Sequence, residues 1–95
     1  MKIKVTIEPQ SLQFIQRQPP EIRKQLRKTI HAVERGEVFP APLEDELDGF
    51  YKLKVNRHRI IIQSVADTEG PFFRVVFAER RRAVYELFSQ ILGLE

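Results

Sequence analysis

The stretch FYKLKVNRHRIII, residues 50–62, decides the fold of this chain because its alternation predicts a β-hairpin. Asn56 and Arg57 are expected to form a two-residue turn between the strands. Side-chain alternation then places Lys54 directly across from Arg59. Like charges at such positions destabilise a strand pair by roughly 0.2–1 kcal/mol. They indicate either an anion-binding face or a solvated edge on which lysine blocks pairing with other chains.

Composition limits the class of protein. With 95 residues, of which 42% are hydrophobic and 31% charged, the chain is expected to fold as a single domain over residues 1–95. It has no cysteine, which excludes disulfides and thiolate chemistry and agrees with a reducing cytoplasm. No signal-peptide core and no bilayer-length apolar run is present, so we expect a cytoplasmic protein without a membrane partner.

Charge is distributed unevenly along the chain. Sixteen Lys and Arg against thirteen Asp and Glu give a formal net charge of +3. The acids gather at residues 44–48, whereas bases concentrate in residues 17–35, 52–59 and 80–82. A basic surface beside an acidic loop favours a polyanionic partner, with nucleic acid the first candidate.

The amino-terminal third predicts one strand and two helices. Residues 2–7 alternate apolar and polar side chains and are expected to form a strand covered on one side. A short helix begins at Pro9 and is stopped by Pro19 and Pro20, and a longer one runs from Pro20 to Gly36. The two helices are expected to form a hairpin. Its basic outer face, within residues 23–28, indicates a solvated face or a support for RNA backbone.

The rest of the chain predicts a loop, three strands and a closing helix. Residues 37–49 are expected to form an irregular surface loop anchored by Leu43 and Leu47, and residues 66–71 a polar turn. Residues 72–78 have two apolar faces and predict a central strand, and residues 82–92 predict a helix. The fold class is therefore α+β: a small antiparallel sheet in β-α-α-β-β-β-α order, with the helical hairpin packed on one face.

Neither a metal nor a cofactor is predicted. His31 and His58 fall in different elements with no third ligand at a familiar spacing. The four glycines are isolated and form no phosphate-cradling loop.

Two segments, PLEDELDGFYKLKVNRHRIII (42–62) and FAERRRAVYELF (77–88), resemble the RelE/ParE superfamily of bacterial toxins from toxin–antitoxin pairs. The resemblance covers essentially the whole chain in element order and length. Its most telling residues are Pro42, Leu43, Leu47, Gly49, the run 51–54, Arg59, Arg80 and Tyr85. It implies a RelE-like fold and a metal-independent endoribonuclease that cuts mRNA on the ribosome by attack of a 2′-hydroxyl on the adjacent phosphate. It also implies a cognate antitoxin.

The resemblance carries over to particular residues. The implied catalytic set is Lys54, Arg59, Arg80 and Tyr85, and the implied RNA-binding set is Lys52, Arg57 and Arg81. Arginine suits the scissile phosphate because a guanidinium can donate two parallel hydrogen bonds to its oxygens. Tyr85 would orient or stack on a splayed base. Lys54 is the candidate for proton transfer if neighbouring cations lower its pKa.

The chain also departs from its relatives. Ala41 stands where some of them place a glutamate as general base, and Val84 and Glu86 flank Tyr85 where some place a histidine. His58 should point to the sheet face opposite Arg59. Without an obvious acid–base pair, such a site would depend on the ribosome to complete it.

Several alternatives stay open. A ParE-type inhibitor of DNA gyrase would have no chemistry of its own, and a small RNA-binding module would hold the backbone without cutting it. Tyr85 suits a core rim as well as a site, the arginine run 80–82 suits a solvated surface, and either Arg80 or Arg81 could face the site.

Overall fold

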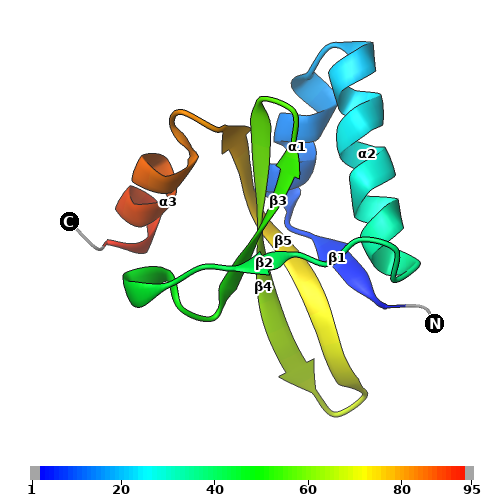
Figure 1. Cartoon of the computed structure of the whole chain (residues 1–95), viewed down its shortest axis with the longest axis vertical. Coiled ribbons are helices and arrows are strands. Elements are labelled where there is room, and N and C mark those ends of the chain that lie inside the picture. Colours follow the sequence, from blue (N-terminus) through cyan, green and yellow to red (C-terminus); the bar gives the residue numbers. More distant parts are fainter. Residues whose placement is uncertain (1–2, 94–95) are drawn as a thin grey trace.

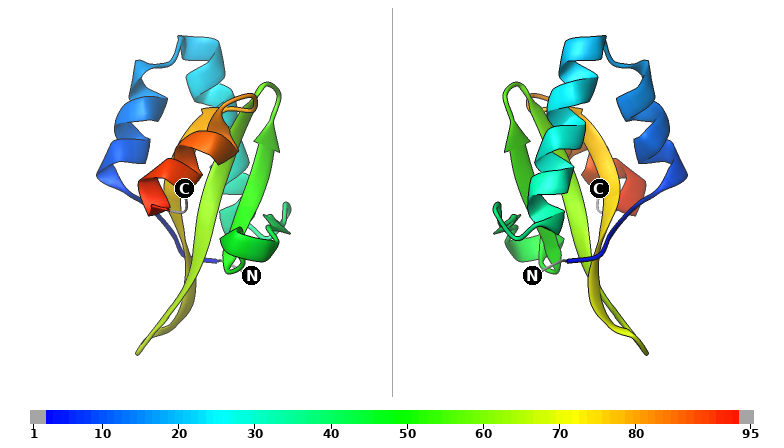
Figure 2. Two further views of the ribbon diagram at one scale, coloured as in Figure 1. Left: turned by 90° about the vertical axis from the view of Figure 1, so that its left-hand side faces the viewer. Right: turned by 90° about the vertical axis from the view of Figure 1, so that its right-hand side faces the viewer.

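The computed structural model describes residues 3–93, in which helices cover both faces of a mixed sheet (Figure 1). The elements are β1 (Val5–Ile7), α1 (Pro9–Arg17), α2 (Pro20–Glu34), β2 (Ala41–Pro42), the 3-10 turn η1 (Asp45–Leu47), β3 (Phe50–Val55), β4 (His58–Asp67), β5 (Gly70–Arg80) and α3 (Val84–Leu92). The five strands are ordered β1-β5-β4-β3-β2. The hairpin of α1 and α2 lies on one face and α3 on the other, as the two side views show (Figure 2). The predicted α+β class and helical hairpin are confirmed.

Proline and glycine set the helix ends as the sequence predicted. Pro9 and Pro20 occupy the first positions of α1 and α2, where the missing N–H has no partner to lose. Gly36 and Gly93 follow α2 and α3 with φ of +73° and +72°, a conformation that glycine adopts without a Cβ clash.

The β3–β4 hairpin has the predicted register. Asn56 opens the turn with φ +54°, which asparagine tolerates better than most residues. Lys54 pairs with Arg59 across the strands, and Lys52 pairs with Ile61. The repulsive pair expected from the sequence is therefore present.

The sheet is mixed, whereas an entirely antiparallel sheet was predicted. β1 runs parallel to β5, with Val5 opposite Phe73. Backbone hydrogen bonds extend this pairing, from Phe73 N to Lys4 O (3.0 Å) and from Glu8 N to Val75 O (2.9 Å). Strands joined by short turns must run antiparallel, but β1 and β5 are separated by most of the chain, so this constraint does not apply to them. Lys2, placed in the predicted strand, lies outside the described residues.

Two loop predictions also need correction. The segment 37–49 is not wholly irregular, because β2 pairs Ala41 with Lys52 and η1 follows it. The turn predicted over residues 66–71 shortens to two residues, since β4 runs to Asp67 and β5 starts at Gly70. Its polar residues belong to a ribbon that projects beyond the helices (Figure 1), where solvent on both sides removes the apolar signal of a strand.

A hydrophobic core lies on each face of the sheet. The larger one packs α1 and α2 against Leu53, Val55, Ile60 and Ile62. The smaller one, the α3-face core, contains Ile61, Val84 and Phe88, with Leu43 and Leu47 packed against it as anchors of their loop. Ile60, Ile61 and Ile62 are fully buried because β4 is covered on both faces. Among the described helices, none is long and apolar enough to cross a membrane.

Candidate functional site

Three predicted site residues lie on the α3 face of the sheet. Leu53, Val55 and Ile60 belong to the core beneath α1 and α2. Alternation therefore turns Lys52, Lys54 and Arg59 to the opposite face. There Lys54, Arg59 and Glu79 occupy directly opposed positions on β3, β4 and β5. We call these three residues the charged row.

Arg59 is held by the turn beside it. Its Nη1 atom donates to the carbonyl oxygens of Asn56 (2.9 Å) and His58 (2.8 Å). A guanidinium has five N–H donors, so these bonds orient the group and leave other donors for a ligand. Across residues 3–93, Arg59 forms no ion pair with a carboxylate. It can therefore brace the hairpin and bind an anion at the same time.

Four arginines surround a hollow at the end of the sheet. Arg57, Arg80, Arg81 and Arg82 line a recess of about 350 Å³, which we call the arginine hollow. The backbone N–H of Arg81 donates to Arg57 O at 2.8 Å and ties the β5–α3 loop to the β3–β4 turn. Within the described chain, none of the four guanidiniums is paired with an acid. Unpaired positive charges that converge on a recess suit a phosphate group.

Arg80 does not belong to the charged row. It pairs with His58 across β4 and β5, whereas Arg59 pairs with Glu79. A β-bulge causes this arrangement: Ile61 is opposite Phe77 and Ile62 is opposite Val75, so Val76 is an extra residue on β5. Phe77 consequently faces α3, whereas uniform alternation along β5 would place it on the side of Val75. Arg80 leaves the strand on the hairpin side and lines the arginine hollow from there.

His58 is buried on the face opposite Arg59, as predicted. It is 7% exposed, and its ring meets Phe14 edge-on at 6.1 Å between centroids. Its Nε2 atom has no hydrogen-bond partner in the described part of the chain. Burial lowers the pKa of His58, and the charge of Arg80 lowers it further, against an opposing effect of Glu79. A buried, neutral ring on this face is unsuited to contact a substrate over the charged row.

Tyr85 lies in the first turn of α3 and packs against the α3-face core. It is half-buried, which agrees with the position on a core rim that the sequence left open. Ile61 in the same core is the cross-strand partner of Lys52. Tyr85 and the strand lysines therefore share one side of the sheet.

The sequence reasoning missed Glu79. Uniform alternation along β5 would have turned this residue to the hairpin side and Arg80 toward the charged row. Glu79 is half-buried, and its Oε2 accepts a hydrogen bond from the backbone N–H of Arg80 at 2.7 Å. The bulge decides which way Glu79 faces, and the sequence contains no glycine that would have marked its position.

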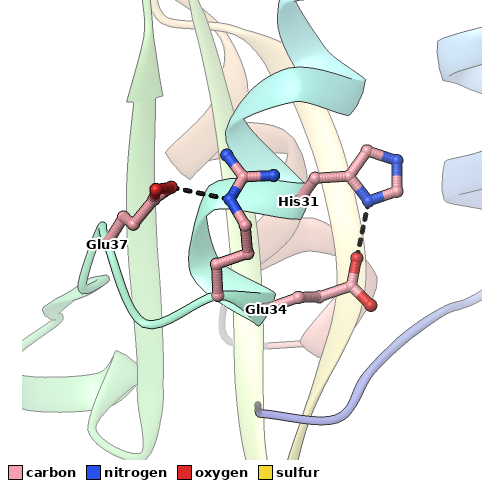
Figure 3. A network of polar contacts seen from close by, with 4 residues as sticks. His31, Glu34 and Glu37 are labelled. Atoms are coloured by element: carbon pink, nitrogen blue, oxygen red, sulfur yellow. Dashed lines mark hydrogen bonds and ion pairs between the residues drawn. The ribbon is translucent and has the colours of Figure 1, made fainter. Parts of the chain in front are cut away.

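The basic outer face of α2 lies away from this site. A second hollow of about 480 Å³ is lined there by Pro20, Arg23, Lys24, Arg27, Lys28, His31 and Arg35. At the end of the helix, His31 Nδ1 lies 2.7 Å from Glu34 and Arg35 Nε lies 2.7 Å from Glu37 (Figure 3). Exposed pairs of this kind contribute about 0–1 kcal/mol each. In the portion described, no three metal-ligating side chains come together.

The fold is shared with solved RelE and YoeB toxins, in agreement with the RelE-like fold that the two sequence segments implied. A mutant of the E. coli toxin RelE in the free state is similar with a TM-score of 0.71 and 19% identity, over 99% of this chain and 98% of that one. The toxin–antitoxin complex RelBE2 from Mycobacterium tuberculosis contains a chain with a TM-score of 0.70 and 17% identity, over 85% of this chain and 100% of that one.

A chain of the YoeB–YefM complex from Staphylococcus aureus is similar with a TM-score of 0.61 and 17% identity, over 85% of this chain and 99% of that one. No family model matches the sequence, and no curated protein matches it. Identities this low establish the shared fold, and the activity has to be argued from the residues of this chain.

Proposed function

We propose that this protein is the toxin of a toxin–antitoxin pair and a RelE-type endoribonuclease that cleaves mRNA on the ribosome. The observation that carries the proposal is the concentration of unpaired cations at one end of the sheet. Lys54 and Arg59 face α3, and Arg57 of the turn between them lines the arginine hollow. The shared fold with RelE and YoeB supports it.

The arrangement suits cleavage of a phosphodiester by its neighbouring 2′-hydroxyl. That reaction needs the RNA backbone held in line and the charge of a dianionic phosphorane stabilised. Arg59 and the arginine hollow supply guanidinium donors for phosphate oxygens, and both Arg80 and Arg81 line the hollow. Tyr85 offers a ring and a hydroxyl on the side of the charged row. Lys52 adds a further positive charge to that face, two residues before Lys54 on β3.

The same surface suits a cognate antitoxin. Uncompensated cations over a sheet attract an acidic chain segment, and occupation by such a segment would block RNA. The complexes of RelBE2 and YoeB–YefM are toxin–antitoxin assemblies, which supports a partner of this kind. Co-purification with the product of an adjacent reading frame would identify it.

Expression without a partner tests the function directly. We expect growth arrest, and in a reconstituted translation system we expect breaks within codons of translated mRNA but not in free mRNA. The paired change Arg80→Ala and Arg81→Ala should lower the single-turnover cleavage rate at saturating ribosome by on the order of 10²-fold or more. The matched control is Lys24→Ala with Lys28→Ala, which removes the same charge from the outer face of α2 and should stay within about threefold.

Other outcomes would contradict the proposal. Growth arrest with intact transcripts and accumulated double-strand DNA breaks would indicate a gyrase inhibitor. Salt-sensitive RNA binding without any cleavage on ribosomes would indicate a non-cleaving RNA-binding module.

A further inference from the structure

We propose that Glu79 is the general base of this site, an inference that rests on the proposed RNA cleavage. The function requires a group that accepts the 2′-hydroxyl proton, and Ala41 cannot do so at the position on β2 opposite Lys52. Strands β3, β4 and β5 contain two carboxylates, Asp67 and Glu79. Asp67 lies at the far end of the β4–β5 ribbon, whereas Glu79 lies opposite Arg59.

The position of Glu79 brings the base beside the phosphate ligand. Directly opposed residues of antiparallel strands have Cβ atoms about 5 Å apart, so Glu79 and Arg59 are immediate neighbours on the α3 face. We therefore place the ribose of a phosphate bound by Arg59 beside the glutamate side chain. Lys54 lies on the other side of Arg59.

The contacts of the Glu79 carboxylate orient the group and leave one of its oxygens without a hydrogen bond. Oε2 accepts the N–H of Arg80 at 2.7 Å, which fixes the side chain against the end of β5. For Oε1, no hydrogen bond occurs within residues 3–93, and Glu79 makes no ion pair there. A half-buried carboxylate with one held and one free oxygen has the geometry of a base poised for a hydroxyl.

The step balances without a further reactant. Oε1 of Glu79 takes the proton of the 2′-hydroxyl while the 2′-oxygen forms a bond to phosphorus. The bond from phosphorus to the 5′-oxygen breaks, and that oxygen takes a proton from the ammonium group of Lys54. The products are a 2′,3′-cyclic phosphate and a 5′-hydroxyl, and solvent returns the proton from Glu79 to Lys54. Arg59, on the same face as Glu79 and Lys54, stabilises the phosphorane charge.

A purely electrostatic role makes the opposite prediction. If Glu79 only offset the neighbouring cations, its neutralisation would strengthen RNA binding and leave cleavage intact or faster. If Glu79 is the base, neutralisation preserves or strengthens binding and removes the chemistry. The cleavage rate of the neutralised variant therefore distinguishes the two roles: it is unchanged or higher for an electrostatic role and much lower for a general base.

The experiment compares Glu79→Gln with Glu86→Gln, which removes the same charge from an exposed position on α3. Single-turnover cleavage is measured on ribosome-bound mRNA at saturating concentration and across pH, and binding on a short single-stranded RNA. We expect Glu79→Gln to cleave about 10²–10⁴-fold more slowly, to bind RNA at least as tightly, and to lose the acidic limb of the pH–rate profile. Glu86→Gln should match the parent, and Glu79→Asp should retain part of the rate.

Cleavage by folded Glu79→Gln within about threefold of the parent would overturn the assignment while leaving the proposed function intact. A parent that leaves translated mRNA uncut would overturn the proposed function itself. If Glu79→Gln melts early, Glu79→Asp decides, because an aspartate that preserves the acidic limb supports the base and one that abolishes it refutes it.

Discussion

Arg59→Ala separates the contacts by which this arginine braces the β3–β4 turn from the phosphate contact proposed for it. Its guanidinium bonds the carbonyl oxygens of Asn56 and His58 at 2.9 and 2.8 Å, so the substitution removes two charge-assisted hydrogen bonds from the β3–β4 turn. Bonds to charged groups contribute about 1.5–3 kcal/mol each when buried. Because this side chain is half-exposed, we expect the pair to contribute about 1–3 kcal/mol in total.

Urea unfolding followed by circular dichroism measures this cost. A loss of that size lowers Tm by roughly 5–20 °C for a domain of this length. The matched control is Lys54→Ala, which removes the same charge from the facing strand. Lys54 is exposed, and its removal relieves the repulsion with Arg59, so the free energy of unfolding should change by less than about 0.5 kcal/mol or rise.

Cleavage by Arg59→Ala is then compared with cleavage by the parent at a temperature where both are fully folded. We expect Arg59→Ala to lose on the order of 10²-fold in rate beyond its stability loss, since we propose that the guanidinium also contacts the charge that develops on the phosphate. Equal stability of Arg59→Ala and the parent would refute the bracing role. A parent-like rate in folded Arg59→Ala would refute the phosphate contact.

Three further predictions concern the residues around the site. Because burial, then Arg80, lowers the pKa of His58 in the folded state, the unfolded chain binds the proton first as the pH falls. The free energy of unfolding should therefore fall as the pH drops below about 6.5, by at most about 1.4 kcal/mol per pH unit from this group, and His58→Phe should flatten that slope in urea titrations, whereas an unchanged slope would contradict the burial of His58. Tyr85→Phe keeps the ring and removes the hydroxyl, so single-turnover cleavage within threefold of the parent would assign Tyr85 to stacking and a loss of about tenfold or more would assign the hydroxyl to catalysis. Phe88→Ala empties the α3-face core and should lower the free energy of unfolding by about 3–5 kcal/mol in the same denaturation assay, and an effect below about 1 kcal/mol would contradict the packing of α3.

Much of the fold follows from local sequence signals. Alternation over residues 50–62 predicted the hairpin and its register, because the side-chain period of a strand and a two-residue turn leave a single pairing of Lys54 with Arg59. Pro9, Pro20 and Gly93 marked helix ends, because their backbone constraints act whatever surrounds them. These features depend on residues close together in the chain.

Part of the site follows from the same local signals. Lys52, Lys54 and Arg59 could be assigned to one sheet face, and His58 to the other, before any tertiary contact was considered. Their roles remain predictions, since the likeness to solved toxins reaches only the fold.

The partner strands and the end of β5 depend on contacts between distant segments. The parallel pairing of β1 with β5 and the addition of β2 beside β3 satisfy backbone groups at the two edges of the sheet, and no short-range pattern encodes them. The bulge at Val76 lies where β5 supplies side chains both to the core beneath α1 and α2 and to the α3-face core. Since one extra residue reverses the alternation that follows it, packing of the two cores turns Glu79 toward Arg59 and sends Arg80 to the other face.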